Sequence, residues 1–503
     1  MFRSILKLAV FLVAISVAIS LCSTGSSAQS GRGRTTPTPT PKPTPKPNVP
    51  LTTVLGIPDG GKLVRQDQDP NNPITSRFAL RNGLTVVTKE RHSSPLVAVN
   101  ITVKTGILNE SDEVAGIARL TQKAVLRGTA TRNGAAIEKE VAKLGGLLTS
   151  HVGYDQTSFT LITATESYAA MVELLADVLM HPAFKDEDVK KAAAEVLLES
   201  RRAQDRIETA SLEKMFAAAF TTHRLKRGSA VSESFLATAT SAQVQAFYQT
   251  HYQPANTVVT VFGDIFTLNA IGQAQLRFGE FKAGVVGSRE SGVVNQQATQ
   301  KSVVVAPNPS ATGTKNASGS AQTNSSTPPK TPITPITPRP LSVATPDQST
   351  LEESQQEKLR YGNARADISQ SLVTVAYRTP AFKADKDGLK ELATLEVLAA
   401  VLGLGDGSRL QQGLRDGLAS RDKLSVANEV SAGFQNFGNI GMLIAQISVE
   451  PERIDRAEAE YLREIERFRR EIISEGELQR AKVLLEREHY DSMMSFENEA
   501  ELL

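Results

Sequence analysis

Residues 116–129 read Gly-Ile-Ala-Arg-Leu-Thr-Gln-Lys-Ala-Val-Leu-Arg-Gly-Thr. We expect a helix here, because the stretch follows a polar turn and, before it, a predicted strand with alternating apolar residues over 97–103. On a helix, positions i, i+3 and i+4 lie on one side. Histidine, glutamate and histidine at that spacing form a zinc site, whereas this chain has Arg119, Gln122 and Lys123 there.

The frame around these positions resembles the insulinase-like metallopeptidases of family M16, which include pitrilysin and the mitochondrial processing peptidases. That family typically has a glycine, two residues, His-x-x-Glu-His, four more residues and Gly-Thr, and Gly116, Gly128 and Thr129 fall into this frame. The resemblance implies that the histidines hold zinc and the glutamate acts as general base. Arginine and lysine have no lone pair to offer at neutral pH, and glutamine cannot act as a base. The motif is therefore expected to be degenerate, with no catalytic residue and no metal ligand.

One ligand position of the family is retained. The resemblance places a third zinc ligand, a glutamate, about 76 residues after the second histidine, and this position is Glu199. A carboxylate beside two cations is expected to form an ion pair rather than to bind zinc. The alternative that Glu199 is one acid among several on a solvated helix stays open. No cofactor is expected in this chain, and zinc is expected only in a partner subunit.

The N-terminal residues predict a secretory signal peptide. A basic start with Arg3 and Lys7 precedes an apolar run over 9–21, and small residues end at Ala28. We therefore expect export to the periplasm or the extracellular space, with no integral membrane segment after cleavage of residues 1–28. The chain's one cysteine, Cys22, lies in the signal, and its use as a lipid anchor stays open.

Composition limits the classes of partner. The chain has 503 residues, of which 40% are hydrophobic and 22% charged, enough for two or more domains with full cores. The formal net charge is +2, and the signal peptide supplies that excess. A mature chain near neutrality argues against a nucleic acid or an anionic membrane as partner.

The chain is expected to form two homologous lobes. Residues 29–73 are a Pro/Thr-rich disordered spacer, 74–300 the first lobe, 301–364 a long disordered linker rich in Ser, Thr, Asn, Gly and Pro, and 365–503 the second lobe. The fold class implied is α+β, with a mainly antiparallel sheet packed with helices in each lobe. Because the second lobe is the shorter, it is either naturally short or the sequence is a fragment that ends early at residue 503.

An internal repeat supports the two lobes without any recognised motif. The predicted strand over 372–377 corresponds to 97–103, and a helix over 388–402 follows where the first lobe has its motif helix. The predicted strand over 441–449 corresponds to 157–163. Further on, Ser474 and Glu477 are spaced as a capping box at the start of a helix.

The first lobe carries other clear signals. Asn82-Gly83 between two apolar runs predicts a hairpin with a two-residue turn. Residues 168–180 have apolar side chains at helical spacing, and the proline after His181 ends that helix. The pattern Phe-Tyr, Tyr-x-Pro-x-Asn and Gly-Asp over 247–264 resembles the end of the family's first lobe, and it is the most specific match in the chain.

The second lobe has a candidate substrate-binding loop. Residues 403–410 read Gly-Leu-Gly-Asp-Gly-Ser-Arg-Leu, and Leu-Arg follows at 414–415. The resemblance implies that this loop binds substrate, and that the arginine and a tyrosine seven residues after it stabilise the tetrahedral intermediate. The tyrosine is absent, since Asp422 stands there. The substrate-binding candidates are Gly405, Gly407, Arg409 and Arg415.

These patterns favour an exported, non-catalytic family member. Our leading hypothesis is a pseudopeptidase subunit that forms a substrate chamber with an active zinc-bearing M16 partner and receives a peptide or unfolded protein. Two alternatives stay open. One is an active zinc metalloendopeptidase with atypical ligands, and the other is a stand-alone peptide-binding or envelope scaffold protein.

Overall fold

The computed structural model describes residues 62–67, 75–282, 360–363, 370–379, 386–418, 424–437 and 440–493. All of them belong to one compact unit, made of Met1–Gly284 and Val343–Leu503. The predicted signal peptide, most of the spacer and most of the linker lie outside the described residues. Within the described part of the chain, no helix has the length and apolar character needed to cross a membrane.

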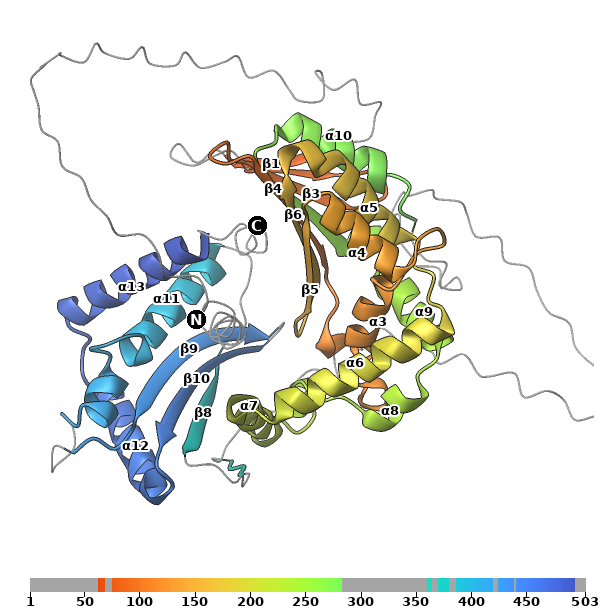
Figure 1. Cartoon of the computed structure of the whole chain (residues 1–503). Coiled ribbons are helices and arrows are strands. Elements are labelled where there is room, and N and C mark those ends of the chain that lie inside the picture. Colours follow the sequence, from red (N-terminus) through yellow and green to blue (C-terminus); the bar gives the residue numbers. More distant parts are fainter. Residues whose placement is uncertain are drawn as a thin grey trace, which may run out of the picture. The chain divides into compact units, whose positions relative to one another are not determined.

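A seven-stranded sheet is the centre of the first lobe (Figure 1). Its strands, in spatial order, are β1 (Lys62–Asp67), β2 (Thr75–Ala79), β3 (Thr85–Glu90), β7 (Thr257–Gly263), β4 (Leu96–Val103), β6 (Thr157–Ala164) and β5 (Leu147–Val152). Every neighbouring pair is antiparallel except β3 with β7, which is parallel. The expected mainly antiparallel sheet is thus confirmed.

Strand β1 differs from the sequence-based expectation, because it lies inside the segment 29–73 that we placed in a disordered spacer. It pairs antiparallel with β2. No proline lies within residues 62–67, although Pro70 and Pro73 follow the strand, so every residue of β1 has a backbone N–H to donate. Composition averaged over the whole spacer concealed this short segment.

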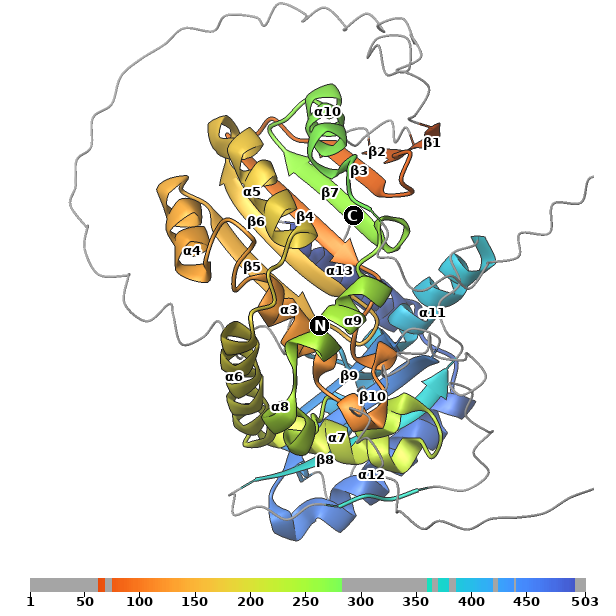
Figure 2. The same ribbon diagram turned by 90° about the vertical axis from the view of Figure 1, so that its right-hand side faces the viewer.

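Helices make up the rest of the first lobe. They are α3 (Ile117–Val125), α4 (Gly134–Lys143), α5 (Tyr168–Met180), α6 (Asp186–Gln204), α7 (Ile207–Ala219), α8 (Glu233–Thr238), α9 (Ser241–His251) and α10 (Thr267–Phe278). Figures 1 and 2 show α4, α5 and α10 along one face of the sheet. Helix α5 has the predicted bounds, and its predicted apolar face is buried in the core.

The connection between β2 and β3 is a hairpin, as predicted, but its turn is of another type. The N–H of Leu80 donates to the carbonyl of Leu84 at 2.8 Å, and the N–H of Gly83 donates to the carbonyl of Leu80 at 2.9 Å. Gly83 has a φ of +90°, and Asn82 has no positive φ. The turn is therefore a type I turn closed by a glycine bulge. The Asn82 side chain donates to the carbonyl of Phe278 at 2.8 Å and ties the hairpin to α10.

The segment 247–264 brings β7 into the middle of the sheet. The side-chain amide of Asn256 donates to Thr105 Oγ1 at 3.1 Å and holds the start of the strand. At its other end, Gly263 has a φ of +128°, and a Cβ there would lie 2.2 Å from the carbonyl oxygen of Leu96. Only glycine fits this position. The pattern that resembled the family's lobe ending therefore has a structural cause.

The second lobe has a three-stranded antiparallel sheet in the order β8, β10, β9. Its elements are β8 (Ser371–Thr379), α11 (Lys386–Gly403), a π-helical turn (Gln411–Arg415), β9 (Glu429–Phe437), β10 (Ile440–Val449), α12 (Ile454–Arg470) and α13 (Glu475–Met493). The strands and the helix expected from the internal repeat are all present. The α+β class with two lobes is confirmed.

Candidate functional site

The motif helix α3 starts at a buried carboxylate. Glu110 accepts the backbone N–H of Gly116 at 2.8 Å and of Ala118 at 2.9 Å. Its Oε2 also accepts Nη2 of Arg227 at 3.0 Å. Burial raises the pKa of Glu110, while Arg227 and the two N–H groups oppose this shift. The pair fixes the first turn of α3, and therefore the residues at the degenerate motif.

Two of the motif positions bond to neighbouring elements. Arg119 Nη1 donates to the carbonyl of Ser229 at 3.0 Å. Gln122 is buried, and its Nε2 donates to Ser150 Oγ on β5. At the position of the family's general base, this chain therefore has an amide that donates a hydrogen bond, which fixes α3 against the sheet.

The structure brings the third motif position together with Glu199. Lys123 Nζ lies 2.8 Å from Glu199 Oε1, and the two side chains are 21% and 59% exposed. The ion pair that we expected for Glu199 is present. It joins α3 to α6.

These side chains do not fit a zinc ion. Zinc in proteins is bound by thiolate, neutral imidazole and carboxylate. A protonated lysine and an arginine offer no lone pair, and the ammonium of Lys123 already binds one oxygen of Glu199. No group of three or more His, Cys, Asp or Glu among the described residues is arranged to hold a metal. We derive no step of hydrolysis through zinc in this chain.

The glycine-rich loop of the second lobe is held by an arginine of α13. Gly405 and Gly407 have φ values of +67° and +82°, so the loop uses backbone conformations that favour glycine. Arg480 Nη1 donates to the carbonyls of Leu404 at 2.9 Å and Asp406 at 3.3 Å. The positive charge also lies at the C-terminal end of α11, where it is favourable for the helix dipole.

Arg409 is part of the core of the second lobe. Its Nε and Nη2 donate to the two oxygens of Glu477 at 2.5 and 3.1 Å. The guanidinium lies 5.1 Å from the ring centre of Phe468. The hydrogen bond from Arg409 lowers the pKa of Glu477 to about 2, and the Ser474 capping box, present as predicted, contributes to this shift. That Arg409 binds substrate stays a prediction, and its guanidinium is already engaged.

Arg415 is more accessible than Arg409. Its Nη1 lies 2.8 Å from Asp406 Oδ1 and its Nε lies 2.9 Å from Asp416 Oδ1. Both carboxylates are at the surface, so these ion pairs are exchangeable with solvent. Of the predicted substrate-binding side chains, Arg415 is the one that a ligand can reach without breaking a buried contact.

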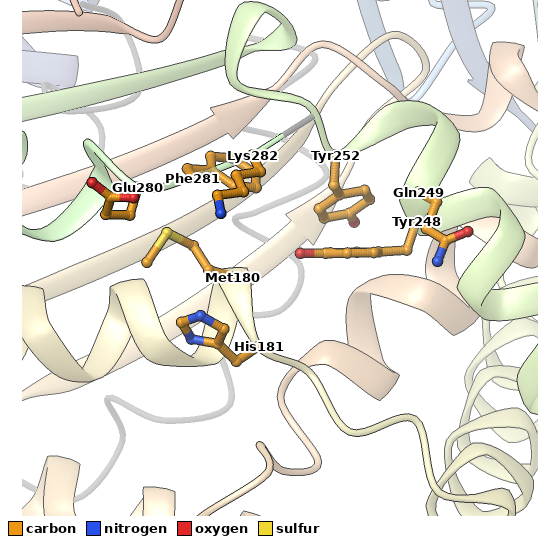
Figure 3. A pocket seen from close by; sticks show the side chains of 8 residues that line it. All are labelled: Met180, His181, Tyr248, Gln249, Tyr252, Glu280, Phe281 and Lys282. Carbon is orange, nitrogen blue, oxygen red and sulfur yellow. The ribbon is translucent and has the colours of Figure 1, made fainter. Parts of the chain in front are cut away.

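A cavity of about 440 Å³ lies elsewhere in the first lobe (Figure 3). Its lining is Met180, His181, Tyr248, Gln249, Tyr252, Glu280, Phe281 and Lys282. The rings of Tyr248 and Tyr252 stack with centres 5.0 Å apart. None of the residues that the sequence singled out as a site residue lines this cavity, and it plays no part in the site described above.

Family models match most of the chain. Residues 85–231 match the Insulinase (Peptidase family M16) model, and residues 238–485 match the Peptidase M16 inactive domain. The chain belongs to peptidase family M16. It is therefore an insulinase-like metallopeptidase homologue whose second model match is to the domain called inactive.

Curated relatives in family M16 are distant. An uncharacterized zinc protease of Rickettsia felis is 25% identical over 205 residues, which are 41% of this chain and 50% of the relative. A probable mitochondrial-processing peptidase subunit beta of Arabidopsis thaliana is 25% identical over 193 residues, 38% of this chain and 36% of the relative. Cytochrome b-c1 complex subunit 1 of Caenorhabditis elegans is 26% identical over 190 residues, 37% and 39% of the two chains. The chain spans half or less of these relatives.

Solved structures share the M16 fold. A protease from Helicobacter pylori has a TM-score of 0.65 at 19% identity, covering 86% of this chain and 88% of that one. The periplasmic protease PqqL from Escherichia coli has a TM-score of 0.57 at 17% identity, covering 84% of this chain and 40% of that one. At this identity the likeness concerns the fold alone.

Two contacts at this site were not predicted from the sequence. One is the bond from Gln122 to Ser150, and the other is a second ion pair, between Arg127 in the turn after α3 and Glu195 on α6. A signal for the second pair was present: Lys123 and Arg127 are four residues apart, and so are Glu195 and Glu199. Two helices with such matched spacings can pair their charges when they cross.

Proposed function

We propose that this chain is an exported, non-catalytic member of family M16 that forms a substrate chamber with an active, zinc-bearing member of the family. The observation that carries the proposal is the state of the motif. The base position holds an amide bonded to Ser150, and the retained carboxylate of Glu199 holds the ammonium of Lys123. Hydrolysis through a zinc-bound water needs a base and free ligands at these positions.

Several comparisons support a partnered role. Two of the relatives are named as subunits, of the mitochondrial-processing peptidase and of the cytochrome b-c1 complex. The second family model is named for an inactive domain. In this proposal the zinc-bearing partner supplies the chemistry, and this chain contributes the wall of a chamber that receives a peptide or an unfolded protein segment.

Export is part of the proposal. The basic, apolar and small residues of the first 28 positions support a cleaved signal peptide. The fold neighbour PqqL is titled a periplasmic protease. We propose the periplasm or the extracellular space as the compartment in which the chain meets its partner.

The test of the partnered role is an affinity purification of the tagged mature chain from the exported fraction of its host. We expect a second M16 chain with an intact His-x-x-Glu-His motif to co-purify in stoichiometric amount, identified by mass spectrometry. Peptide cleavage should require both chains. Recovery of this chain alone, or with unrelated envelope proteins, would contradict the partnered role and favour a stand-alone peptide-binding or scaffold protein.

The loss of zinc chemistry is tested by restoring the motif. The variant Arg119→His, Gln122→Glu and Lys123→His should bind one zinc per chain, because Glu199 already lies beside position 123. The unmodified chain, measured in the same way by metal analysis after dialysis, is the control and should retain none. Stoichiometric zinc in the unmodified chain, with cleavage of unstructured peptides by that chain alone, would refute the proposal.

A further inference from the structure

Helix α3 and the turn after it are joined to α6 by two ion pairs. Lys123 Nζ lies 2.8 Å from Glu199 Oε1, and Arg127 Nη2 contacts Glu195 Oε1. Arg127 lies in the turn that follows the last residue of α3, so moving four residues forward along the chain from Lys123 corresponds to moving four residues back on α6. Helices α3 and α6 therefore run antiparallel past each other.

The ion pairs lie at the rim of a buried apolar contact. Leu120 and Ala124 of α3 belong to the same core as Ala192 and Val196 of α6. The apolar side chains hold the helices together on the inner side. The ion pairs cross-link them on the outer side, where the metal ligands of the family would stand.

We infer that Lys123 takes the place of the metal as the positive charge that holds Glu199 against α3, so that the crossing of α3 and α6 is stabilised without a metal ion. A zinc ion would bridge the two helices through ligands from both. Here one ammonium bridges them, and its partner is the carboxylate that the family uses as a ligand. The inference goes beyond the proposed function, since it does not depend on any partner subunit.

The position of Lys123 distinguishes this pair from an ordinary surface ion pair. Exposed pairs contribute little, because solvent screens them and both side chains lose entropy when they meet. Lys123 is only 21% exposed, and a second ion pair, between Arg127 and Glu195, joins the turn after α3 to α6. Lys191 and Glu187 offer a matched control. They form a pair of the same types at 2.7 Å, 56% and 79% exposed, but both lie on α6 and cross-link nothing.

The experiment uses the full mature chain. Lys123→Met should lower the Tm by about 2–3 °C, whereas Lys191→Met should change it by less than about 1 °C. Hydrogen exchange measured by mass spectrometry should become faster in peptides of α3 and α6 in the first variant alone. Addition of EDTA should leave the Tm of the unmodified chain unchanged, because no metal contributes to the crossing.

A double-mutant cycle shows whether the two residues act as a pair. Glu199→Gln and Lys123→Met should be non-additive, so that the double variant is no less stable than Lys123→Met alone. Should Lys123→Met not fold, Lys123→Gln takes its place in the cycle. Additive effects, or equal effects of Lys123→Met and Lys191→Met, would overturn the inference. This result is independent of zinc content and of co-purification, which test the proposed function.

Discussion

The family resemblance predicts one functional site in each lobe. In each of these sites, a predicted site residue forms an ion pair. In the first lobe the pair is Lys123 with Glu199, whose side chains are 21% and 59% exposed. In the second lobe it is Arg409 with Glu477, whose side chains are 7% and 26% exposed. Both sites contain an ion pair, but the side chains of the two pairs differ in how deeply they are buried. The first pair borders solvent, whereas the second is part of the lobe's core.

The two ion pairs also differ in the number of contacts that each cation makes. Lys123 makes a single contact with one carboxylate oxygen, whereas Arg409 donates to both oxygens of Glu477 and also lies over Phe468. Two parallel bonds from a planar guanidinium are stronger and more specific than one bond from an ammonium. We conclude that substitution of Lys123 should cost less stability than substitution of Arg409, which is primarily a structural residue of the second lobe.

The largest effect is expected from Arg409→Met. The change removes a guanidinium that is 7% exposed and leaves the carboxylate of Glu477, which is 26% exposed, without its charged partner. Because two charge-assisted hydrogen bonds are lost, we expect a loss of about 2–3 kcal/mol in the free energy of unfolding. Urea denaturation of the mature chain, followed by circular dichroism, measures it. Arg409→Lys keeps the charge but loses the paired bonds, so its free energy of unfolding should lie between those of the unmodified chain and Arg409→Met. A loss of less than about 0.5 kcal/mol for Arg409→Met would contradict a structural role for this residue.

The pH dependence of stability should separate the lobes. Burial lowers the pKa of His251, in the first lobe, to about 4 from its usual 6.5. Because the unfolded chain takes up this proton more readily, the contribution of His251 to stability is complete above pH 6.5 and falls as the pH drops towards 4, by about 2 kcal/mol at pH 5. Thermal unfolding between pH 7.5 and about 5 measures the loss.

The control for this prediction is His251→Phe, which removes the titrating group and keeps a ring beside Phe247. Its stability should vary less between pH 7.5 and about 5 than that of the unmodified chain. The faster hydrogen exchange at pH 5, after correction for the intrinsic rate, should be confined to the first lobe. An equal pH effect in peptides of the second lobe would show that His251 is not the group responsible.

The smallest effect is expected from Arg415→Ala. Its partners Asp406 and Asp416 are at the surface, so the free energy of unfolding should change by no more than about 0.5 kcal/mol. If Arg415 binds substrate, the affinity of the chain for a fluorescent unfolded peptide should fall. Fluorescence anisotropy measures that affinity, and Arg453→Ala, which removes another surface arginine, is the control. Unchanged affinity would remove Arg415 from the substrate-binding candidates.

Local patterns predicted most of the fold. The apolar spacing of 168–180 predicted α5, and Ser474 with Glu477 predicted the start of α13, because both signals act over a few residues. The Asn82-Gly83 hairpin was predicted, but the two-residue turn was wrong. The bond from the Asn82 side chain to α10 spans 196 residues, and no local pattern predicts it.

The candidate site was harder to predict for the same reason. Substitution at positions 119, 122 and 123 was visible in the sequence, and so was the ion pair expected for Glu199. The partners of the other side chains were not. Glu110 and Arg227 are 117 residues apart, and Arg409 and Glu477 are 68 apart. No periodicity connects such pairs, and only the folded topology brings them together.

The place of β7 in the sheet has a consequence for the order of folding. Strands β3 and β4 are neighbours in the chain, yet β7, which ends at Gly263, lies between them and pairs with both. Until β7 has been synthesised, strands β1–β3 cannot be joined to strands β4–β6 by the backbone hydrogen bonds that β7 makes with β3 and β4. Such distant pairing is slow to form because a long loop must close first. The first lobe therefore completes its sheet late, and a chain that emerges from its N-terminus keeps its two halves apart until about 180 residues after β3 begins.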